Sequence, residues 1–371
     1  MAKDLSNRMT TLQTRLITFY LPQFHPIPEN DEWWGKGFTE WANVTRTRPL
    51  FRGHYQPHLP ADLGFYDLRL PEARQAQADL AREYGIDGFC YYHYWFKGKR
   101  LLERPFNEVL ASGKPNFPFC LCWANETWSR RWLGEESHIL AKQDYSPQDD
   151  LVHARSLLPA FADPRAIKVD GRPLFLVYRP KDLPEPERTT DVFRQACLEN
   201  GLPEPYLVGV NAHCRRENCK LIGFDHTLDF RPQLGALPGA FKEGRNWDKL
   251  RRNLRQGILS PDLTVYEYGK AIAQMEKAPD DFDKIPSVFV GWDNTPRRGE
   301  KGIVVRNTSP QRFERYLADT IAEAKPIGAD GKLVFINAWN EWAEGNHLEP
   351  DQEHGHAFLE AVRRAKNAAR G

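Results

Sequence analysis

The feature that most restricts the fold of this chain is a series of eight short apolar segments that alternate with helical patterns. The segments have the length and composition of buried β-strands; they cover residues 16–21, 86–96, 117–124, 173–178, 206–210, 224–230, 285–292 and 333–336. A helical segment between two strands predicts parallel pairing through right-handed crossovers. Eight such units predict an α/β fold, a closed (β/α)8 TIM barrel.

The helical patterns and the remaining loops complete this prediction. Helices are expected at residues 71–84, 101–111, 148–161, 185–200, 215–222, 311–324 and 355–369. Three long stretches, 26–70, 125–147 and 232–284, are expected to be irregular insertions in the loops that follow strands, and loops of this length are usually functional. Residues 1–15 are expected to form a lead-in, and residues 16–371 a single catalytic barrel domain.

Nearly every predicted strand ends in polar or aromatic side chains. In a barrel the carboxyl ends of all strands share one face, and barrel enzymes hold their catalytic groups there. The candidate substrate-binding residues are therefore those at the strand ends and in the first insertion: Gln23, His25, Glu40, Trp41, His93, Tyr94, Trp95, Trp123, Asn125, Glu126, Trp128, Tyr178, Arg179, Asn211, Asp229, Trp292, Asp293, Arg297, Asn340 and Trp342. An open doubly wound sheet would place function at one switch point instead, and no glycine-rich phosphate loop follows any strand.

Two carboxylates stand out in the stretch that follows the last strand. Glu341 and Glu344 lie three residues apart, on either side of the indole of Trp342. A carboxylate against an aromatic wall loses hydration, which raises its pKa. One carboxyl can then stay protonated at neutral pH while its neighbour is ionised, as glycoside cleavage requires. The simpler alternative is an exposed loop whose acids cap the next helix.

Other carboxylates compete for a catalytic role. The pair Asn125-Glu126 after the third strand resembles the Asn-Glu pair of several barrel glycosidases, in which the glutamate is the acid. Glu126 and Glu341 would then form the catalytic pair from opposite sides of the barrel. Glu126 could equally bind substrate or pair with a nearby arginine, and Glu40 is a further candidate.

Composition excludes several classes of function. The chain has 51 basic and 50 acidic residues, a formal net charge of +1, so a nucleic-acid-binding protein is not expected. No apolar run reaches the roughly 18 residues of a membrane span, and the polar start of the chain does not match a signal peptide. The six cysteines indicate no disulfide framework, which favours a cytoplasmic location. The 11 tryptophans and 13 tyrosines, many in polar surroundings, suit stacking on sugar rings.

No metal site or other cofactor is expected. His25, His54 and His58 are the histidines that invite a metal hypothesis. Pro57 lies between His54 and His58, so their spacing is not helical and does not aim both rings at one point. His25 lies at a strand end with only Gln23 near it in the sequence.

Four motifs together resemble the WbsX-type proteins of the glycoside hydrolase family 99-like group. They are Phe19-Tyr-Leu-Pro-Gln-Phe-His-Pro26, the Trp33-Trp-Gly35 and Gly37-Phe-Thr-Glu-Trp41 segments, His54-Tyr-Gln-Pro-His58, and Asn340-Glu-Trp-Ala-Glu-Gly345. The resemblance covers about residues 16–365. WbsX-type proteins are commonly labelled glycosyltransferases of lipopolysaccharide O-antigen or other surface polysaccharides. The related hydrolases are retaining endo-α-1,2-mannosidases on a (β/α)8 barrel.

The resemblance also implies roles for individual residues. The hydrolases carry both catalytic acids in a Glu-Trp-x-Glu motif, whose glutamates fall on Glu341 and Glu344. Glu341 would act as base toward the substrate's own 2-hydroxyl, which attacks the anomeric carbon and gives a 1,2-anhydro sugar. Glu344 would protonate the leaving oxygen and then serve as base for water. Internal attack needs the 2-hydroxyl anti to the leaving group, which α-mannosides and α-rhamnosides provide and α-glucosides do not.

Two positions depart from the pattern of the hydrolases. The segment Asp293-Asn-Thr-Pro-Arg297 loosely resembles their substrate-contacting Asp-x-Thr-x-x-Arg segment, but its spacing differs by one residue. Arg298 is therefore an alternative to Arg297. Ala343 stands where the hydrolases usually have a polar residue, so contacts to the leaving group are expected to differ.

Three functions remain open at this point. The first is a carbohydrate-active enzyme that cleaves, or transfers from, a 1,2-trans glycoside of an oligosaccharide or polysaccharide with retention. The second is a glycosyltransferase of surface-polysaccharide biosynthesis, although the chain lacks a phosphate-cradling loop and a clear Asp-x-Asp motif for a nucleotide sugar. The third is a non-catalytic sugar-binding barrel.

Overall fold

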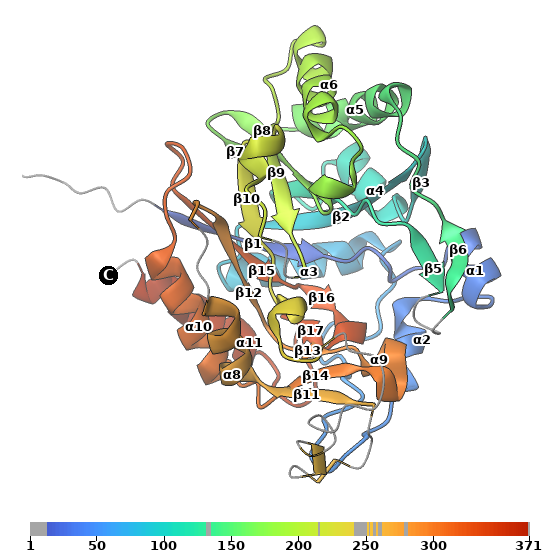
Figure 1. The fold of residues 1–371 in the computed structure, drawn as a ribbon, viewed down its shortest axis with the longest axis vertical. Helices are drawn as coiled ribbons and strands as arrows, with labels where there is room; N and C mark the ends of the chain where they lie inside the picture. The colour runs from blue at the N-terminus through green and yellow to red at the C-terminus, as the bar shows by residue number, and fades with distance from the viewer. Residues whose placement is uncertain are drawn as a thin grey trace, which may run out of the picture.

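In a computed structural model of the protein, eight parallel strands close into a barrel (Figure 1). The strands are β1 (Thr14–Tyr20), β2 (Gly88–Phe96), β4 (Phe119–Trp123), β8 (Arg172–Val177), β9 (Tyr206–Asn211), β10 (His226–Asp229), β12 (Ile285–Phe289) and β15 (Lys332–Asn337). They pair side by side in this order, and β15 pairs again with β1. The predicted TIM barrel is therefore confirmed, and each predicted strand overlaps one strand of the barrel wall.

The structure describes residues 13–369 except 131–134, 214–215, 241–250, 252, 255–256, 259–261 and 278–280. Most of the expected lead-in, residues 1–15, lies outside the described residues. Within the described part of the chain, every helix is too short or too polar to cross a lipid bilayer.

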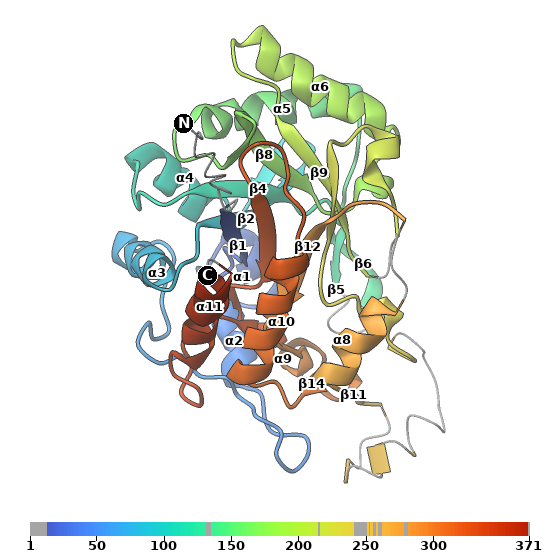
Figure 2. The same cartoon turned by 90° about the vertical axis from the view of Figure 1, so that its left-hand side faces the viewer.

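Helices cover the outside of the barrel. They are α3 (Pro71–Glu83), α4 (Arg104–Ser112), α5 (Pro147–Ala162), α6 (Pro186–Glu199), α8 (Tyr268–Glu276), α10 (Pro310–Glu323) and α11 (Ala357–Ala368). The start of α10 follows from local sequence, because Ser309 Oγ accepts a hydrogen bond from the backbone N–H of Arg312 and Pro310 occupies the first turn. Its buried side chains recur every four residues at Phe313, Leu317 and Ile321. Helices α10 and α11 lie side by side in both views (Figures 1 and 2).

Side-chain alternation along the strands separates two packed layers. In β2, Cys90 packs inside the barrel in the same cluster as Phe19 and Phe335. Its neighbours Phe89 and Tyr91 point to the helix side, where Tyr91 packs against Phe106 of α4 with ring centroids 5.3 Å apart. This alternation decides which residues near each strand end can reach the mouth of the barrel.

The long insertions are not irregular, and here the prediction was wrong. The first contains α1 (Pro28–Trp34) and α2 (Glu40–Thr45), the second a hairpin of β5 (Trp128–Arg130) and β6 (Glu135–Ala141), and the third η4 (Leu234–Ala236), β11 (Thr264–Glu267) and α8. Strand β11 pairs with β14 (Ile303–Arg306), which pairs with β13 (Trp292–Asp293) after β12. This small sheet joins segments far apart in the chain, so local sequence pattern did not reveal it.

The other short elements join or flank the barrel units. They are β3 (Lys99–Leu101), β7 (Lys168–Val169), η2 (Pro180–Asp182), η3 (Cys219–Ile222), α9 (Thr295–Arg298), η5 (Gly299–Lys301), β16 (Asn340–Glu341), η6 (Trp342–Glu344) and β17 (Asn346–His347). Of these, α9, β16 and η6 carry the charged residues at the mouth of the barrel.

Candidate active site

A tight hairpin after β15 carries the two predicted catalytic glutamates. Strands β16 and β17 pair antiparallel, with Glu341 opposite Asn346. Glu344 ends η6, and Gly345 follows with a φ of 55°, in the left-handed region that favours glycine. A Cβ on Gly345 would lie 2.9 Å from the Cβ of Asp293, so only glycine lets the hairpin pack against this neighbouring segment.

Two predicted binding residues of this hairpin prove to be supports. The Asn340 side chain accepts a hydrogen bond from the Leu21 N–H at 2.7 Å and donates one to the Leu21 carbonyl at 3.0 Å, which ties the hairpin to the end of β1. Trp342 is fully buried, and its indole N–H donates to Glu349 at 2.6 Å. Burial raises the pKa of Glu349 to about 7. The two residues that flank Glu341 are therefore fixed by buried hydrogen bonds.

One arginine contacts three carboxylates. Arg297 Nη1 lies 2.6 Å from Glu344 Oε1, and Nη2 lies 3.3 Å from Glu341 Oε2 and 3.1 Å from Glu40 Oε2. Glu40 is completely buried and lies on α2 in the first insertion. The predicted convergence of Glu341 and Glu344 is therefore present, with Arg297 between them and Glu40 behind it.

Burial sets the protonation of this group. Burial and, after it, repulsion by Glu344 raise the pKa of Glu341 to about 8, although Arg297 acts in the opposite direction. Burial also raises the pKa of Glu344. The pKa of Arg297 lies above its usual range, because the attraction of Glu40, Glu344 and Glu341 outweighs burial, which lowers it. The two glutamates titrate together, and the pair keeps a proton near neutral pH.

Asp293 positions Arg297 rather than substrate. Its Oδ1 accepts hydrogen bonds from the N–H and the hydroxyl of Thr295, at 3.0 and 2.6 Å, at the start of α9, which carries Arg297. Its Oδ2 accepts from Gln56 Nε2 at 2.7 Å and lies 2.6 Å from His54 Nε2. These bonds lower the pKa of Asp293 although burial raises it, so the anchor is ionised.

A cavity of about 600 Å³ opens beside the glutamates, within the usual range for ligand sites. The predicted site residues that line it are Gln23, Tyr94, Glu126, Trp128, Tyr178, Arg179, Trp292, Arg297, Glu341 and Glu344. They follow six of the barrel strands or lie at their carboxyl ends, which is the face that the barrel prediction selected. Contact of these side chains with a sugar stays a prediction.

On the opposite wall of the cavity, Glu126 forms an ion pair. Arg179 Nε donates to Glu126 Oε1 at 2.8 Å, and both side chains are partly exposed. Asn125 fixes the backbone of Arg179, because its Oδ1 accepts from the Arg179 N–H at 2.7 Å and its Nδ2 donates to the Arg179 carbonyl at 2.9 Å. Glu126 therefore has a cationic partner of its own, and its charge also raises the pKa of Glu344.

The remaining predicted binding residues lie outside the cavity lining, which corrects their expected placement. Five of them are buried supports of the Arg297 cluster: Glu40, Trp41, Asp293, Asn340 and Trp342. Asn125 is buried as well and supports Arg179. His93, Trp95 and Trp123 point to the helix layer by strand alternation; His93 contacts His153, and Trp95 donates to Asp149. His25 is buried near Asp67, Asn211 bonds the Glu217 carbonyl, and Asp229 pairs with Arg231 and Lys284 beside a second cavity.

Several lining residues were missed or not chosen. They include Asn30, Trp34, Tyr92, His213, Phe230 and Arg298. Alternation could have found Tyr92, because it shares the inward face of β2 with Tyr94, whereas the prediction took the last residues of the strand on both faces. Asn30 and Trp34 lie on α1, whose position no sequence pattern indicated.

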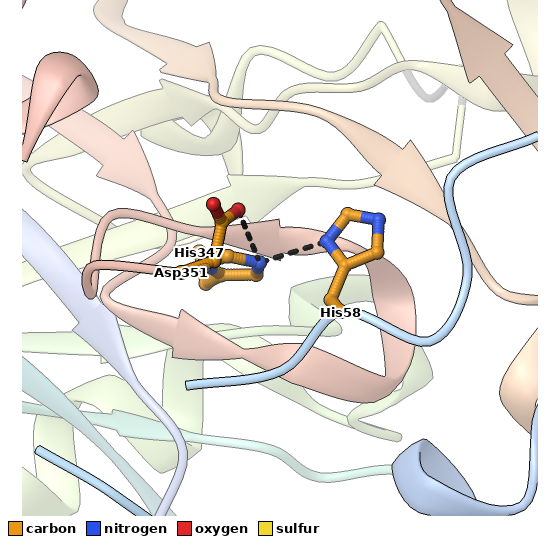
Figure 3. A group of neighbouring side chains, drawn as sticks. All are labelled: His58, His347 and Asp351. Atoms are coloured by element: carbon orange, nitrogen blue, oxygen red, sulfur yellow. Dashed lines mark hydrogen bonds and ion pairs between the residues drawn. The ribbon is translucent and has the colours of Figure 1, made fainter. Parts of the chain in front are cut away.

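A second cluster lies behind the catalytic hairpin. Among the described residues, the side chains of His58, His347 and Asp351 bring one donor atom each within 4.8 Å of one another (Figure 3). On sequence alone, His58 was considered as a metal ligand only together with His25 and His54. Neither of these two histidines belongs to the cluster. The partners of His58 come from the far end of the chain.

Comparison with known proteins agrees with this architecture. The family model described as Glycosyltransferase WbsX matches residues 16–362. The chain belongs to the WbsX family. Two proteins described as "Uncharacterized protein WxcX", from strains B100 and ATCC 33913 of Xanthomonas campestris pv. campestris, are each 46% identical over 363 residues, 97% of this chain and 50% of theirs. The chain therefore spans about half the length of these two relatives.

Two solved structures share this fold. A GH99 endo-alpha-mannosidase from Bacteroides thetaiotaomicron has a TM-score of 0.56 at 14% identity, with 96% of this chain and 97% of that chain covered. A structure described as a glycoside hydrolase-like protein gives the same TM-score at 12% identity, with 95% and 93% covered. At these identities the likeness shows the fold alone, a (β/α)8 barrel of the kind found in these two structures.

Proposed function

We propose that this WbsX protein is a glycoside hydrolase or transglycosylase that acts with retention on a 1,2-trans glycoside of an oligosaccharide or polysaccharide. The observation that carries the proposal is the placement of Glu341 and Glu344 at one cavity wall, both in contact with Arg297. A buried carboxyl pair that keeps one proton supplies an acid and a base in the same site. Aromatic side chains around the cavity, such as Trp128 and Tyr178, offer faces for sugar rings.

The reaction follows the order that the resemblance implies. Glu341 takes the proton of the substrate 2-hydroxyl, and that oxygen bonds to the anomeric carbon while the glycosidic bond breaks. Glu344 gives its proton to the leaving oxygen, and a 1,2-anhydro sugar remains. Water, deprotonated by Glu344, then opens the three-membered ring from the opposite face, and the 2-oxygen takes back a proton from Glu341. Two inversions at the same carbon give net retention.

Without a sugar bound, the shared proton of the pair is expected on Glu341 rather than on Glu344. Arg297 lies closer to Glu344 than to Glu341, at 2.6 against 3.3 Å, and so stabilises the Glu344 anion more strongly. Burial raises the pKa of Glu341 to about 8. The proposed roles therefore require the proton to pass to Glu344 when a sugar enters and changes the contacts of Arg297. This requirement makes the assignment of roles testable.

The test is a product screen by mass spectrometry with a panel of α-mannosides, α-rhamnosides and bacterial polysaccharides. We expect cleavage or transfer of a 1,2-trans glycoside. Two matched substrates serve as controls: the corresponding α-glucoside, whose 2-hydroxyl is not anti to the leaving group, and a 2-O-methyl glycoside, which has no proton to lose. Equal turnover of the 2-O-methyl glycoside would refute the anhydro-sugar route while leaving a carboxylate nucleophile in place.

The description of the matched family supports a second candidate, a glycosyltransferase in surface-polysaccharide biosynthesis, such as that of lipopolysaccharide. The cations at the cavity, Arg179, Arg297 and Arg298, could meet the phosphates of an activated sugar donor. Calorimetry separates the two candidates: saturable binding of a nucleotide sugar by the wild-type protein favours the transferase, and its absence together with glycoside turnover favours the hydrolase.

A further inference from the structure

Three donor atoms from two distant parts of the chain meet behind the catalytic hairpin. His58 Nδ1 lies 2.9 Å from His347 Nε2, and His347 Nε2 lies 3.8 Å from Asp351 Oδ2 (Figure 3). Ligand atoms of a tetrahedral zinc ion, each about 2.0–2.1 Å from the metal, lie about 3.3 Å apart. These two separations lie on either side of this value, and all three donor atoms lie within 4.8 Å of one another, so side-chain adjustments without backbone rearrangement would bring them around one ion.

The surroundings of the cluster orient each donor. His347 Nδ1 lies 3.0 Å from the Glu349 carbonyl, which can only accept a hydrogen bond. Nδ1 therefore carries the ring proton, and Nε2 presents its lone pair to His58 and Asp351. A backbone carbonyl in this position is the usual outer partner of a metal-bound histidine.

The carboxylate of Asp351 is held in a comparable way. Its Oδ1 accepts hydrogen bonds from the backbone N–H groups of Glu353 and His354, at 3.0 and 2.6 Å. The other oxygen, Oδ2, faces His347. Outer hydrogen bonds to one oxygen leave the second free to bind a cation.

The backbone fixes the two segments that supply the ligands. The Ala61 N–H donates to the Pro350 carbonyl, and the Gln352 N–H donates to the Leu59 carbonyl, both at 2.9 Å. These bonds join the segment after His58 to the segment around Asp351 as an antiparallel bridge. Donor atoms held in place before the metal arrives lose little freedom on binding.

A cavity of about 240 Å³ gives access to the cluster, and its lining includes all three side chains and His354. His354 Nδ1 is buried and lies 3.4 Å from Asp351 Oδ1, the oxygen that does not face His347. The cavity leaves the fourth position to water. Two imidazoles and one carboxylate are a donor set that favours Zn²⁺ over Mg²⁺ or Ca²⁺, which prefer oxygen ligands.

We propose that His58, His347 and Asp351 form a zinc site that fastens the first insertion to the hairpin carrying Glu341 and Glu344. His347 lies on β17, directly opposite Asn340 of β16, and its ring stacks on Trp342 at a centroid distance of 3.8 Å. An ion here would hold the catalytic hairpin from the side away from the sugar cavity. Its role would be positional, because none of the three ligands lines that cavity.

The test uses the full chain, stripped with a chelator and titrated with Zn²⁺ by calorimetry, with metal content measured by mass spectrometry and thermal unfolding followed in parallel. We expect one Zn²⁺ per chain, a higher Tm with Zn²⁺, and no competition by excess Mg²⁺. Asp351→Asn keeps the size and the backbone hydrogen bonds of the carboxylate but removes its charge. It should weaken binding at least ~100-fold, beyond the ~10–100-fold typical of lost outer partners.

His58→Gln provides an independent variant on a half-buried position, so loss of binding does not depend on one substitution. The matched control is His356→Gln, which breaks a surface pair between His356 and Asp62 that is 2.6 Å apart. Circular dichroism without metal verifies that each variant is folded. Zinc binding that is equally strong in Asp351→Asn, His58→Gln and the wild type would overturn the proposal, as would a wild type that binds no zinc.

Discussion

Replacing Glu341 by glutamine should make the free energy of unfolding less dependent on pH. Burial, aided by Glu344, raises the pKa of Glu341 from 4.5 to about 8 in the folded protein. The folded state therefore binds this proton more tightly than the unfolded chain. The stabilisation is fully present below pH 4.5 and is lost as the pH rises toward 8.

The magnitude follows from the size of this shift. Between the two pKa values, each pH unit costs about 1.4 kcal/mol of unfolding free energy. From pH 5 to pH 7 the wild type should lose roughly 2–3 kcal/mol through this group, because titration in the unfolded chain is still incomplete at pH 5. Glutamine has the same size and does not titrate, so Glu341→Gln should lack this loss.

The assay is urea unfolding at pH 5, 6, 7 and 8, followed by the fluorescence of the 11 tryptophans. The control is Glu83→Gln, at an exposed position at the end of α3, which should show the wild-type dependence on pH. If wild type and Glu341→Gln lose stability in parallel between pH 5 and 7, burial does not raise the pKa of Glu341 and the electrostatic argument for the site is refuted.

Three further predictions concern the same site. Arg297→Met should lower the unfolding free energy by ~3–5 kcal/mol at pH 7, because it leaves buried carboxylates without a cation. The loss should be smaller at pH 5, where these carboxyls protonate; equal losses of unfolding free energy by urea titration at both pH values would contradict this. Glu344→Gln should regain activity on aryl glycosides, whose leaving groups need no acid, and Glu341→Gln should not; the reverse pattern in initial rates would exchange their roles. Trp128→Ala should raise KM about 10-fold, worth about 1.4 kcal/mol, if its indole stacks on a sugar; an unchanged KM would place it outside the binding site.

The barrel could be predicted because its signals are local. Apolar runs such as Val334-Phe335-Ile336 predict buried strands, and the Ser309-Pro310 cap with repeated apolar residues predicts α10. The sheet formed by β11, β14 and β13 could not be predicted, since its pairing depends on contacts between segments far apart in the sequence.

The candidate site shows the same division. Glu341 and Glu344 were selected because two carboxylates flank an indole after a buried strand, and Arg297 because its segment loosely resembles one of the hydrolases. The structure brings the three side chains together. Trp342 and Asp293 were equally conspicuous, yet the structure gives them supporting roles, because burial and hydrogen-bond partners depend on tertiary contacts. The encounter of His58 with His347 was invisible for the same reason, as 289 residues separate them.

The most direct test of the account compares turnover with binding in the two glutamate variants. On the glycoside identified by the product screen, Glu341→Gln and Glu344→Gln should each reduce kcat by at least ~100-fold. Calorimetry should show that both variants still bind this glycoside, with Kd values within a few-fold of each other. If either variant keeps the wild-type kcat, the two glutamates do not act together in catalysis and the central claim fails.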